Sequence, residues 1–179
     1  AIGTFEEPAG IEAAARGCDR ALLLVPVDQR MTEFAASAIA ALSRAGVGHI
    51  VYFSAIGANP GGKSFFTRAH GQAERALRES GRAWTALRPN FFMQNALASA
   101  ATIKAESRFY NHIAGKSSHV EVRDIAAVAA RVLSDPVEQH RGKALNITGP
   151  ESLGSAERAA IMSRVLGRTV TSVDIPRDA

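Results

Sequence analysis

The chain of 179 residues has little that would tie it to an oxidising compartment or a membrane. Its single cysteine, Cys18, cannot form a disulfide within the chain, which fits a reducing environment, and we expect a cytoplasmic protein. No apolar run approaches the ~18–20 residues that a membrane-spanning helix requires. The opening residues, AIGTFEEP, have neither the basic segment nor the apolar stretch of a signal peptide. The sequence therefore predicts no membrane partner.

Blocks of like charge are also missing. The 21 Lys and Arg residues exceed the 17 Asp and Glu residues to give a net charge of +4, but they are dispersed along the chain. This pattern predicts an ordinary solvated surface and no nucleic-acid partner. No cluster of His, Cys, Asp or Glu has the spacing of a metal site, so we expect no metal. A hydrophobic content of 46% is typical of a globular protein with one core.

Continuous apolar runs of strand length alternate with amphipathic runs of helical length. The expected strands cover 21–25, 49–54, 83–87, 144–148 and 169–175, and the expected helices cover 11–16, 31–45, 64–80, 90–101, 124–133 and 155–166. This alternation predicts an α/β fold with a doubly wound parallel sheet, covered by helices on both faces. Parallel sheets of this kind bind ligands at the carboxyl ends of their strands. We expect a site where Val25-Pro26, Ser54-Ala55 and Pro89-Asn90 follow three of these strands.

Residues 57–64, GANPGGKS, fit the phosphate-loop pattern G-x-x-x-x-G-K-[ST], between a predicted strand and a predicted helix. Pro60 argues against a phosphate site, because it removes an N–H from the loop that would have to cradle phosphate oxygens. The expected magnesium-binding aspartate is also poorly placed, since Asp28 lies three residues beyond Val25. The alternative interpretation is a surface loop in which Ser64 caps the next helix.

Several longer segments resemble the NmrA-like branch of the atypical short-chain dehydrogenase/reductases. They are VYFSAIGA, FFTRAHGQAERALRESG, WTALRPNFFMQN, FEEPAGIEAAARGCDRALLLVP, VEVRDIAAVAARVLSDP and LNITGPESLGSAERAAIMSRVLGR. The resemblance covers nearly all of the chain, in order. It implies a Rossmann-like fold, with residues 1–179 as a single NAD(P)-binding domain and residues from about 90 onward as its substrate-side portion. The expected cofactor is NADP or NAD, and GANPGGKS becomes a variable loop with a chance match.

The resemblance also implies that a segment of the family pattern is absent. Family members begin with a strand, a glycine-rich turn and a helix, which together hold the pyrophosphate of the cofactor. The sequence resembles the family only after these elements, so we expect a domain that is truncated at its N-terminus. The alternatives are that the missing segment is supplied elsewhere or that dinucleotide binding is impaired.

The resemblance places the reaction chemistry on two segments. Ser54 takes the place of the family serine, and Phe66 and His70 stand where the tyrosine and lysine of Tyr-x-x-x-Lys would be. We therefore predict Ser54 and His70 as catalytic residues, while Phe66 cannot donate a proton. His70 would titrate near neutrality and could bind the ribose or relay a proton. The alternative is that His70 only packs beside Ala73 and Leu77 on one helical face.

In relatives, the turn that contains Pro89 and Asn90 closes over the nicotinamide. The resemblance thus implies cofactor binding by Val25, Pro26, Ser54, Ala55, His70, Pro89, Asn90 and Phe91, and substrate binding by Phe66, Phe92, Met93 and Asn95. A strand-to-helix turn with core aromatics is the alternative. Tyr110, His112 and His119 are weaker candidates for the substrate pocket. His49 and His140 are expected at the surface.

The resemblance implies an NAD(P)H-dependent oxidoreductase that transfers a hydride to a small quinone-like or carbonyl substrate. The loss of both members of the Tyr-x-x-x-Lys pair leaves a non-catalytic NAD(P) sensor as the alternative. A hydrolase triad of Ser54, His70 and Asp124 is disfavoured, because no G-x-S-x-G turn surrounds the serine. A small-molecule substrate is the expected partner, with a homodimer as a further option.

Overall fold

The computed structural model describes residues 4–111, 113 and 115–175. The chain divides into two compact units. The first unit contains residues 1–89 and 125–147, and the second contains residues 90–124 and 148–179. The boundary after Pro89 coincides with the position from which a substrate-side portion is expected, and that role stays a prediction.

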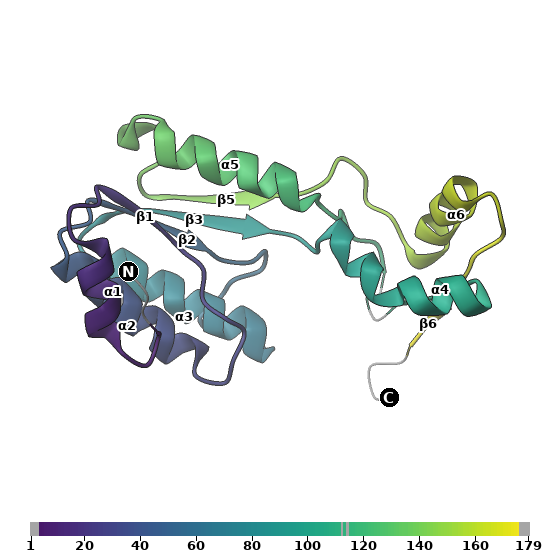
Figure 1. Ribbon diagram of the computed structural model, residues 1–179, viewed down its shortest axis with the longest axis horizontal. Coiled ribbons are helices and arrows are strands. Elements are labelled where there is room, and N and C mark those ends of the chain that lie inside the picture. The colour runs from purple at the N-terminus through teal and green to yellow at the C-terminus, as the bar shows by residue number, and fades with distance from the viewer. Residues whose placement is uncertain (1–3, 112, 114, 176–179) are drawn as a thin grey trace. The chain divides into compact units, whose positions relative to one another are not determined.

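The first unit is built on a parallel sheet of four strands in the order β1-β2-β3-β5. These strands are β1 (Arg20–Leu23), β2 (His49–Phe53), β3 (Ala83–Pro89) and β5 (Lys143–Ile147). Helices α1 (Pro8–Ala15), α2 (Met31–Arg44) and α3 (Phe65–Glu79) lie on one face, and α5 (Val122–Ser134) lies on the other (Figure 1). A short 3-10 helix, η2 (Val137–Gln139), precedes β5. The α/β class with a parallel sheet is thereby confirmed.

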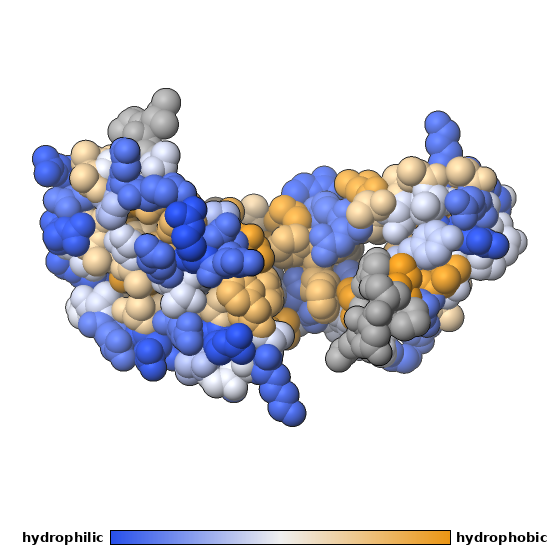
Figure 2. All heavy atoms as spheres, turned by 90° about the horizontal axis from the view of Figure 1, so that it is seen from below, coloured by the Kyte–Doolittle hydropathy of each residue, from blue (hydrophilic) through white to orange (hydrophobic). Residues whose placement is uncertain are grey.

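The core of the first unit lies between this sheet and α2 and α3. Ile50 and Tyr52 of β2 are fully buried, as are Ala38 of α2 and Leu77 of α3. The buried residues of α2 and α3 recur every three or four positions, so each helix turns one face inward, whereas β2 is buried on both faces. In Figure 2, the side covered by α1, α2 and α3 carries many hydrophilic side chains, with apolar ones among them.

Of the two histidines that were expected at the surface, one is buried. His49 is fully buried, because β2 lies between β1 and β3 in the sheet. Its Nε2 forms a hydrogen bond with Thr85 Oγ1 at 2.9 Å. His140 is partly covered and contacts Asp135 through Nε2 at 3.1 Å. The expectation for His49 is wrong, because this residue is the first of β2 and does not merely precede the strand, whereas His140 keeps some exposure.

The loop GANPGGKS uses its backbone N–H groups internally. The N–H groups of Ala58 and Gly62 donate to Ala55 O and Asn59 O, and that of Asn59 donates to Thr67 O. The N–H of Gly61 donates to Asn59 Oδ1 at 2.9 Å. Pro60 has no N–H, so the five residues from Ala58 to Gly62 offer no free backbone donor to a phosphate. Ser64 caps α3 by accepting from the N–H of Thr67, as the alternative interpretation expected.

The second unit is smaller and contains η1 (Met93–Ser99), α4 (Ala100–Glu106), β4 (Arg108–Asn111), α6 (Ser155–Leu166) and β6 (Thr171–Asp174). Strands β4 and β6 form a two-stranded parallel sheet. The helix expected over 90–101 begins only at Met93 and starts as a 3-10 helix. The preceding residues are extended because Phe91 O accepts from the N–H of Val120, and the N–H of Met93 donates to Val120 O.

Within the part of the chain that the structure describes, no helix is both long and apolar enough to cross a membrane.

Candidate functional site

The carboxyl ends of β2 and β3 lie side by side in the first unit. Their pairing continues past Phe53, because the N–H of Ser54 donates to Leu87 O at 2.7 Å and that of Ile56 donates to Pro89 O at 3.0 Å. Strand β1 pairs with β2 in parallel, so Val25 and Pro26 follow it at the same edge of the sheet. Five predicted cofactor residues thus come together there, namely Val25, Pro26, Ser54, Ala55 and Pro89. Their roles stay predictions.

Ser54 is held by a buried carboxylate. Its hydroxyl donates to Glu74 Oε1 at 2.7 Å, and both side chains are almost completely buried. Arg88 binds the two oxygens of Glu74 through Nε and Nη2 at 2.7 and 2.6 Å. Arg78 adds a contact of 2.8 Å to Oε2. The hydroxyl proton of Ser54 is therefore committed to Glu74, and its oxygen lone pairs are left to accept hydrogen bonds.

His70 lies in a packed aromatic cluster. Its Nδ1 forms a hydrogen bond with Tyr52 Oη at 3.0 Å, and the ring of Phe66 meets it edge-on at 4.5 Å. Burial lowers the pKa of His70 to about 4, although the charge of Glu74 opposes this shift. Burial also raises the pKa of Tyr52. His70 is neutral at neutral pH, so it neither titrates near neutrality as expected nor supplies the positive charge of a lysine.

The sequence reasoning missed Glu74 and Arg88. Glu74 follows His70 by four residues and precedes Leu77 by three, so it stands on the apolar stripe of α3. A carboxylate on such a stripe needs a buried cation or several donors, and this was the available signal. Its partner Arg88 lies on a different element and has no local sequence signature.

The second unit contains a pocket of about 730 Å³. Its lining is mainly apolar, and Figure 2 shows hydrophobic side chains gathered on this unit. Of the predicted substrate residues, Met93 and Asn95 line the pocket; so do Phe91, which was assigned to the cofactor, and the weaker candidates Tyr110 and His119.

The other predicted residues around this turn have different places. The backbone of Phe92 pairs with Val120 in an isolated bridge. The side-chain oxygen of Asn90 accepts from Ser117 Oγ at 3.3 Å. Phe66 belongs to the first unit, and His112 lies outside the described residues.

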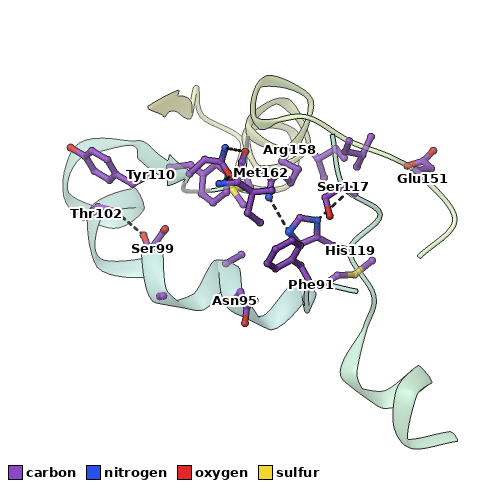
Figure 3. A pocket seen from close by; sticks show the side chains of 18 of the residues that line it. Phe91, Asn95, Ser99, Thr102, Tyr110, Ser117, His119, Glu151, Arg158 and Met162 are labelled. Atoms are coloured by element: carbon purple, nitrogen blue, oxygen red, sulfur yellow. Dashed lines mark hydrogen bonds between the residues drawn. The ribbon is translucent and has the colours of Figure 1, made fainter. Parts of the chain in front are cut away.

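One cation dominates the polar part of the pocket. The guanidinium of Arg158, on the first turn of α6, donates from Nη2 to Asn111 Oδ1 at 2.7 Å and from Nη1 to His119 Nε2 at 3.0 Å. It also donates from Nε to Gly154 O at 3.3 Å, and it lies over the ring of Phe109. Figure 3 shows Arg158 pointing toward His119. Sequence reasoning did not single out Arg158, although it shares the pocket-facing side of α6 with Ile161 and Met162.

The contact with Arg158 fixes the protonation of His119. An arginine only donates hydrogen bonds, so His119 Nε2 is an acceptor and the ring proton is on Nδ1, 3.4 Å from Ser117 O. Burial lowers the pKa of His119 and the charge of Arg158 lowers it further, against the Ser117 hydrogen bond. The neutral ring stacks on Phe91, with centroids 5.8 Å apart. Both rings line the pocket and give it aromatic surface.

Comparison with known proteins identifies relatives of the whole chain. Residues 1–136 match a family model described as NAD(P)H-binding. The chain is 39% identical to the NAD(P)H azoreductase of Xenophilus azovorans over 176 residues, which is 98% of this chain and 61% of the relative. The chain therefore spans about three-fifths of the length of this relative.

Solved structures show the same fold. The NADPH-dependent quinone oxidoreductase of Escherichia coli, complexed with NADPH, superposes with a TM-score of 0.85 at 28% identity, over 97% of this chain and 61% of that chain. NmrA, described as a negative transcriptional regulator, superposes with a TM-score of 0.78 at 17% identity, over 97% of this chain and 59% of that chain. At that identity NmrA supports the fold alone.

Proposed function

Because this chain belongs to the NAD(P)H-binding family, we propose that it binds NADPH or NADH and reduces a small quinone-like or carbonyl substrate. The observation that carries this proposal is the edge of the parallel sheet where Ser54, Ala55 and Pro89 meet. The names of the azoreductase and quinone oxidoreductase relatives support a reductase. NADP is the expected cofactor, with NAD as the alternative.

The residues at this edge suit a nicotinamide cofactor. Pro26, Ala55 and Pro89 are small or rigid, so a flat ring could approach the backbone closely. The lone pairs of the Ser54 oxygen are free to accept hydrogen bonds, because the hydroxyl hydrogen is used in the hydrogen bond to Glu74. When bound, the reduced nicotinamide supplies a hydride to the substrate. The residues of the chain hold and orient the reactants and keep water out.

The substrate would occupy the pocket of the second unit. Phe91 and His119 offer aromatic surface for a substrate ring, and Met93 and Met162 give an adaptable apolar lining. Phe66 replaces the proton-donating tyrosine, and His70 is neutral and buried. A quinone-like acceptor suits such a site, because its reduction needs less help from a fixed acid.

The test is NADPH oxidation with a simple quinone, followed by the loss of reduced-nicotinamide absorbance. We expect oxidation that depends on both the quinone and the protein. Ser54→Ala should lower kcat/KM by about 10-fold or more, as expected for a group near the reacting atoms. Arg75→Ala is a matched control on the exposed side of α3 and should leave the rate unchanged. Absence of quinone-dependent oxidation would contradict the reductase proposal.

A non-catalytic NAD(P) sensor is the second candidate, and one observation favours it. Neither Phe66 nor the neutral His70 can replace the tyrosine–lysine pair as an acid. A sensor would bind NADPH without oxidising it in the presence of any quinone, so the same assay with a binding measurement separates the two functions. A homodimer and a cytoplasmic location remain part of the proposal.

A further inference from the structure

Arg158 is a cation without an ion-pair partner among the residues that the structure describes. Its three hydrogen bonds go to neutral groups: the Gly154 carbonyl, the Asn111 amide oxygen and the His119 ring. Asp174 acts on it through its charge, while the oxygens of Asp174 accept from Asn111 Nδ2 at 2.8 Å and from Ser155 Oγ at 3.1 Å. Burial accordingly lowers the pKa of Arg158 more than the charge of Asp174 raises it. Within the described part of the chain, the guanidinium is therefore not directly bonded to a carboxylate.

The nearby carboxylates do not neutralise this charge. Glu157 is engaged by Lys116 Nζ at 2.7 Å and by the N–H of Gly154 at 2.6 Å. Glu151 lines the same pocket, but Figure 3 shows its side chain pointing away from Arg158. Both carboxylates are thus directed elsewhere.

The guanidinium also has spare donors. It carries five N–H groups, and the hydrogen bonds to described residues engage three of them. Of the two N–H groups that remain, one is on Nη1 and the other is on Nη2. Asn111, which is 4% exposed, accepts a hydrogen bond from the guanidinium. Its side chain is held in turn by the hydrogen bonds that its Nδ2 donates to Ile113 O and Asp174 Oδ1. Spare donors on a held guanidinium suit the oxygens of a carboxylate or sulfonate.

The rest of the pocket is shaped for a flat apolar body. The stacked rings of Phe91 and His119 adjoin the cation, and Phe109 lies below the guanidinium. Leu153, Ile161 and Met162 add aliphatic surface. The cavity of about 730 Å³ has the size of pockets that hold drug-sized ligands.

We propose that the pocket of the second unit binds a flat aromatic electron acceptor that carries an anionic group, and that Arg158 pairs with this group. Asn111 and His119 are positioning residues for the guanidinium. This inference rests on the proposed function to the extent that the bound molecule is the substrate. It adds a property of the substrate, namely a carboxylate or sulfonate on its aromatic system.

The test measures binding by calorimetry without cofactor, using naphthalenesulfonate and naphthylmethanol as an anionic and a neutral probe. We expect the sulfonate to bind about 10- to 100-fold more tightly, which is typical of a hydrogen-bonded charged group. Arg158→Gln should remove this preference while the neutral probe binds as before. Arg158→Lys should retain part of it. Arg164→Gln, on the exposed side of α6, is the matched control and should change neither affinity.

Equal affinity for the two probes, or a preference that survives in Arg158→Gln, would overturn the proposal. If Arg158→Gln fails to fold, salt titration of the unaltered chain decides. Added salt should weaken the binding of the sulfonate and leave that of the neutral probe unchanged, and equal salt effects would refute the pairing.

Anion preference without quinone-dependent NADPH oxidation refutes only the reductase function. Oxidation without anion preference refutes only the role of Arg158.

Discussion

At the scale of single residues, the first unit contains a buried ionic cluster that no short sequence motif predicts. Glu74 is 1% exposed and receives hydrogen bonds from Ser54, Arg78 and Arg88. Removing a cation from such a cluster leaves a carboxylate in a place that water cannot reach. Replacing both members by apolar groups is commonly much less damaging.

We therefore expect Arg88→Met to lower the free energy of unfolding by about 2–4 kcal/mol. The double variant Glu74→Met/Arg88→Met should recover part of this loss, because no buried carboxylate then remains that has lost its two hydrogen bonds from Arg88. Urea denaturation of the two single variants and the double variant measures the coupling. Strictly additive effects would show that Glu74 and Arg88 do not depend on each other.

His70 gives the first unit a dependence on pH. Its pKa falls from 6.5 to about 4 on folding, mainly through burial. The unfolded chain therefore binds more protons than the folded chain between these values, and stability is lost as the pH falls. The contribution of His70 is fully present above about pH 6.5 and is lost by about pH 4.

We expect the unaltered chain to lose roughly 1–2 kcal/mol more stability than His70→Gln between pH 7 and pH 5. Comparison with the variant is needed because the pKa values of His49 and His119 are also lowered by burial. Urea denaturation at both pH values provides the measurement. The same pH dependence in both proteins would show that His70 does not titrate in this way.

At the scale of elements, the first unit could be predicted well because its signals are local. The strand expected over 49–54 is β2 (His49–Phe53), and the helix expected over 64–80 is α3 (Phe65–Glu79). The strand expected over 83–87 extends to Pro89 because its pairing with β5 continues to Ile147. Strand β4 (Arg108–Asn111) was missed, since its four residues become a strand only by pairing with β6, about 60 residues later in the chain.

The part of the candidate site that lies on the first unit could be predicted where it follows strand ends. Ser54 and Ala55 lie at the expected edge because the end of an apolar run can be read from the sequence. The contacts of Glu74 and Arg158 depend on groups from distant elements, so no spacing rule reveals them. The spacing of apolar residues predicted a helix from residue 90. The pairing of Phe91 with Val120 instead keeps this segment extended, the helix begins at Met93, and Phe91 lines the pocket.

Helix α3 approaches the loop GANPGGKS closely at Gly71. A Cβ atom at this position would lie 2.1 Å from the carbonyl carbon of Asn59 and 2.2 Å from Pro60 N. We expect Gly71→Ala to destabilise the protein by about 1–3 kcal/mol through overpacking, although alanine favours helices more than glycine does. Arg75→Ala on the same helix should change stability by less than about 0.5 kcal/mol.

Thermal unfolding measures both variants. A Gly71→Ala protein as stable as the unaltered chain would show that the loop can move away from α3 at little cost.

At the scale of the whole molecule, the same sequence offers two nucleotide-binding interpretations, and the hydrogen bonds of the loop distinguish them. The phosphate-loop pattern is complete in sequence, but the N–H groups of Ala58, Asn59, Gly61 and Gly62 are already bonded within the protein. The dinucleotide interpretation depends on the order and spacing of segments along the whole chain and agrees with the family match over residues 1–136. A local motif is weaker evidence than this global consistency.

We therefore expect NADPH, and not ATP, to stabilise the protein against heat. At a concentration 100 times its Kd, a ligand adds about 2.7 kcal/mol, which corresponds to a rise of roughly 5–10 °C in the unfolding midpoint for a chain of this size. Lys63→Ala removes the lysine that a true phosphate loop requires and should leave the NADPH effect unchanged. A midpoint raised by ATP and restored to its ligand-free value by Lys63→Ala would instead make GANPGGKS the nucleotide site, since only a lysine that contacts phosphate would produce that result.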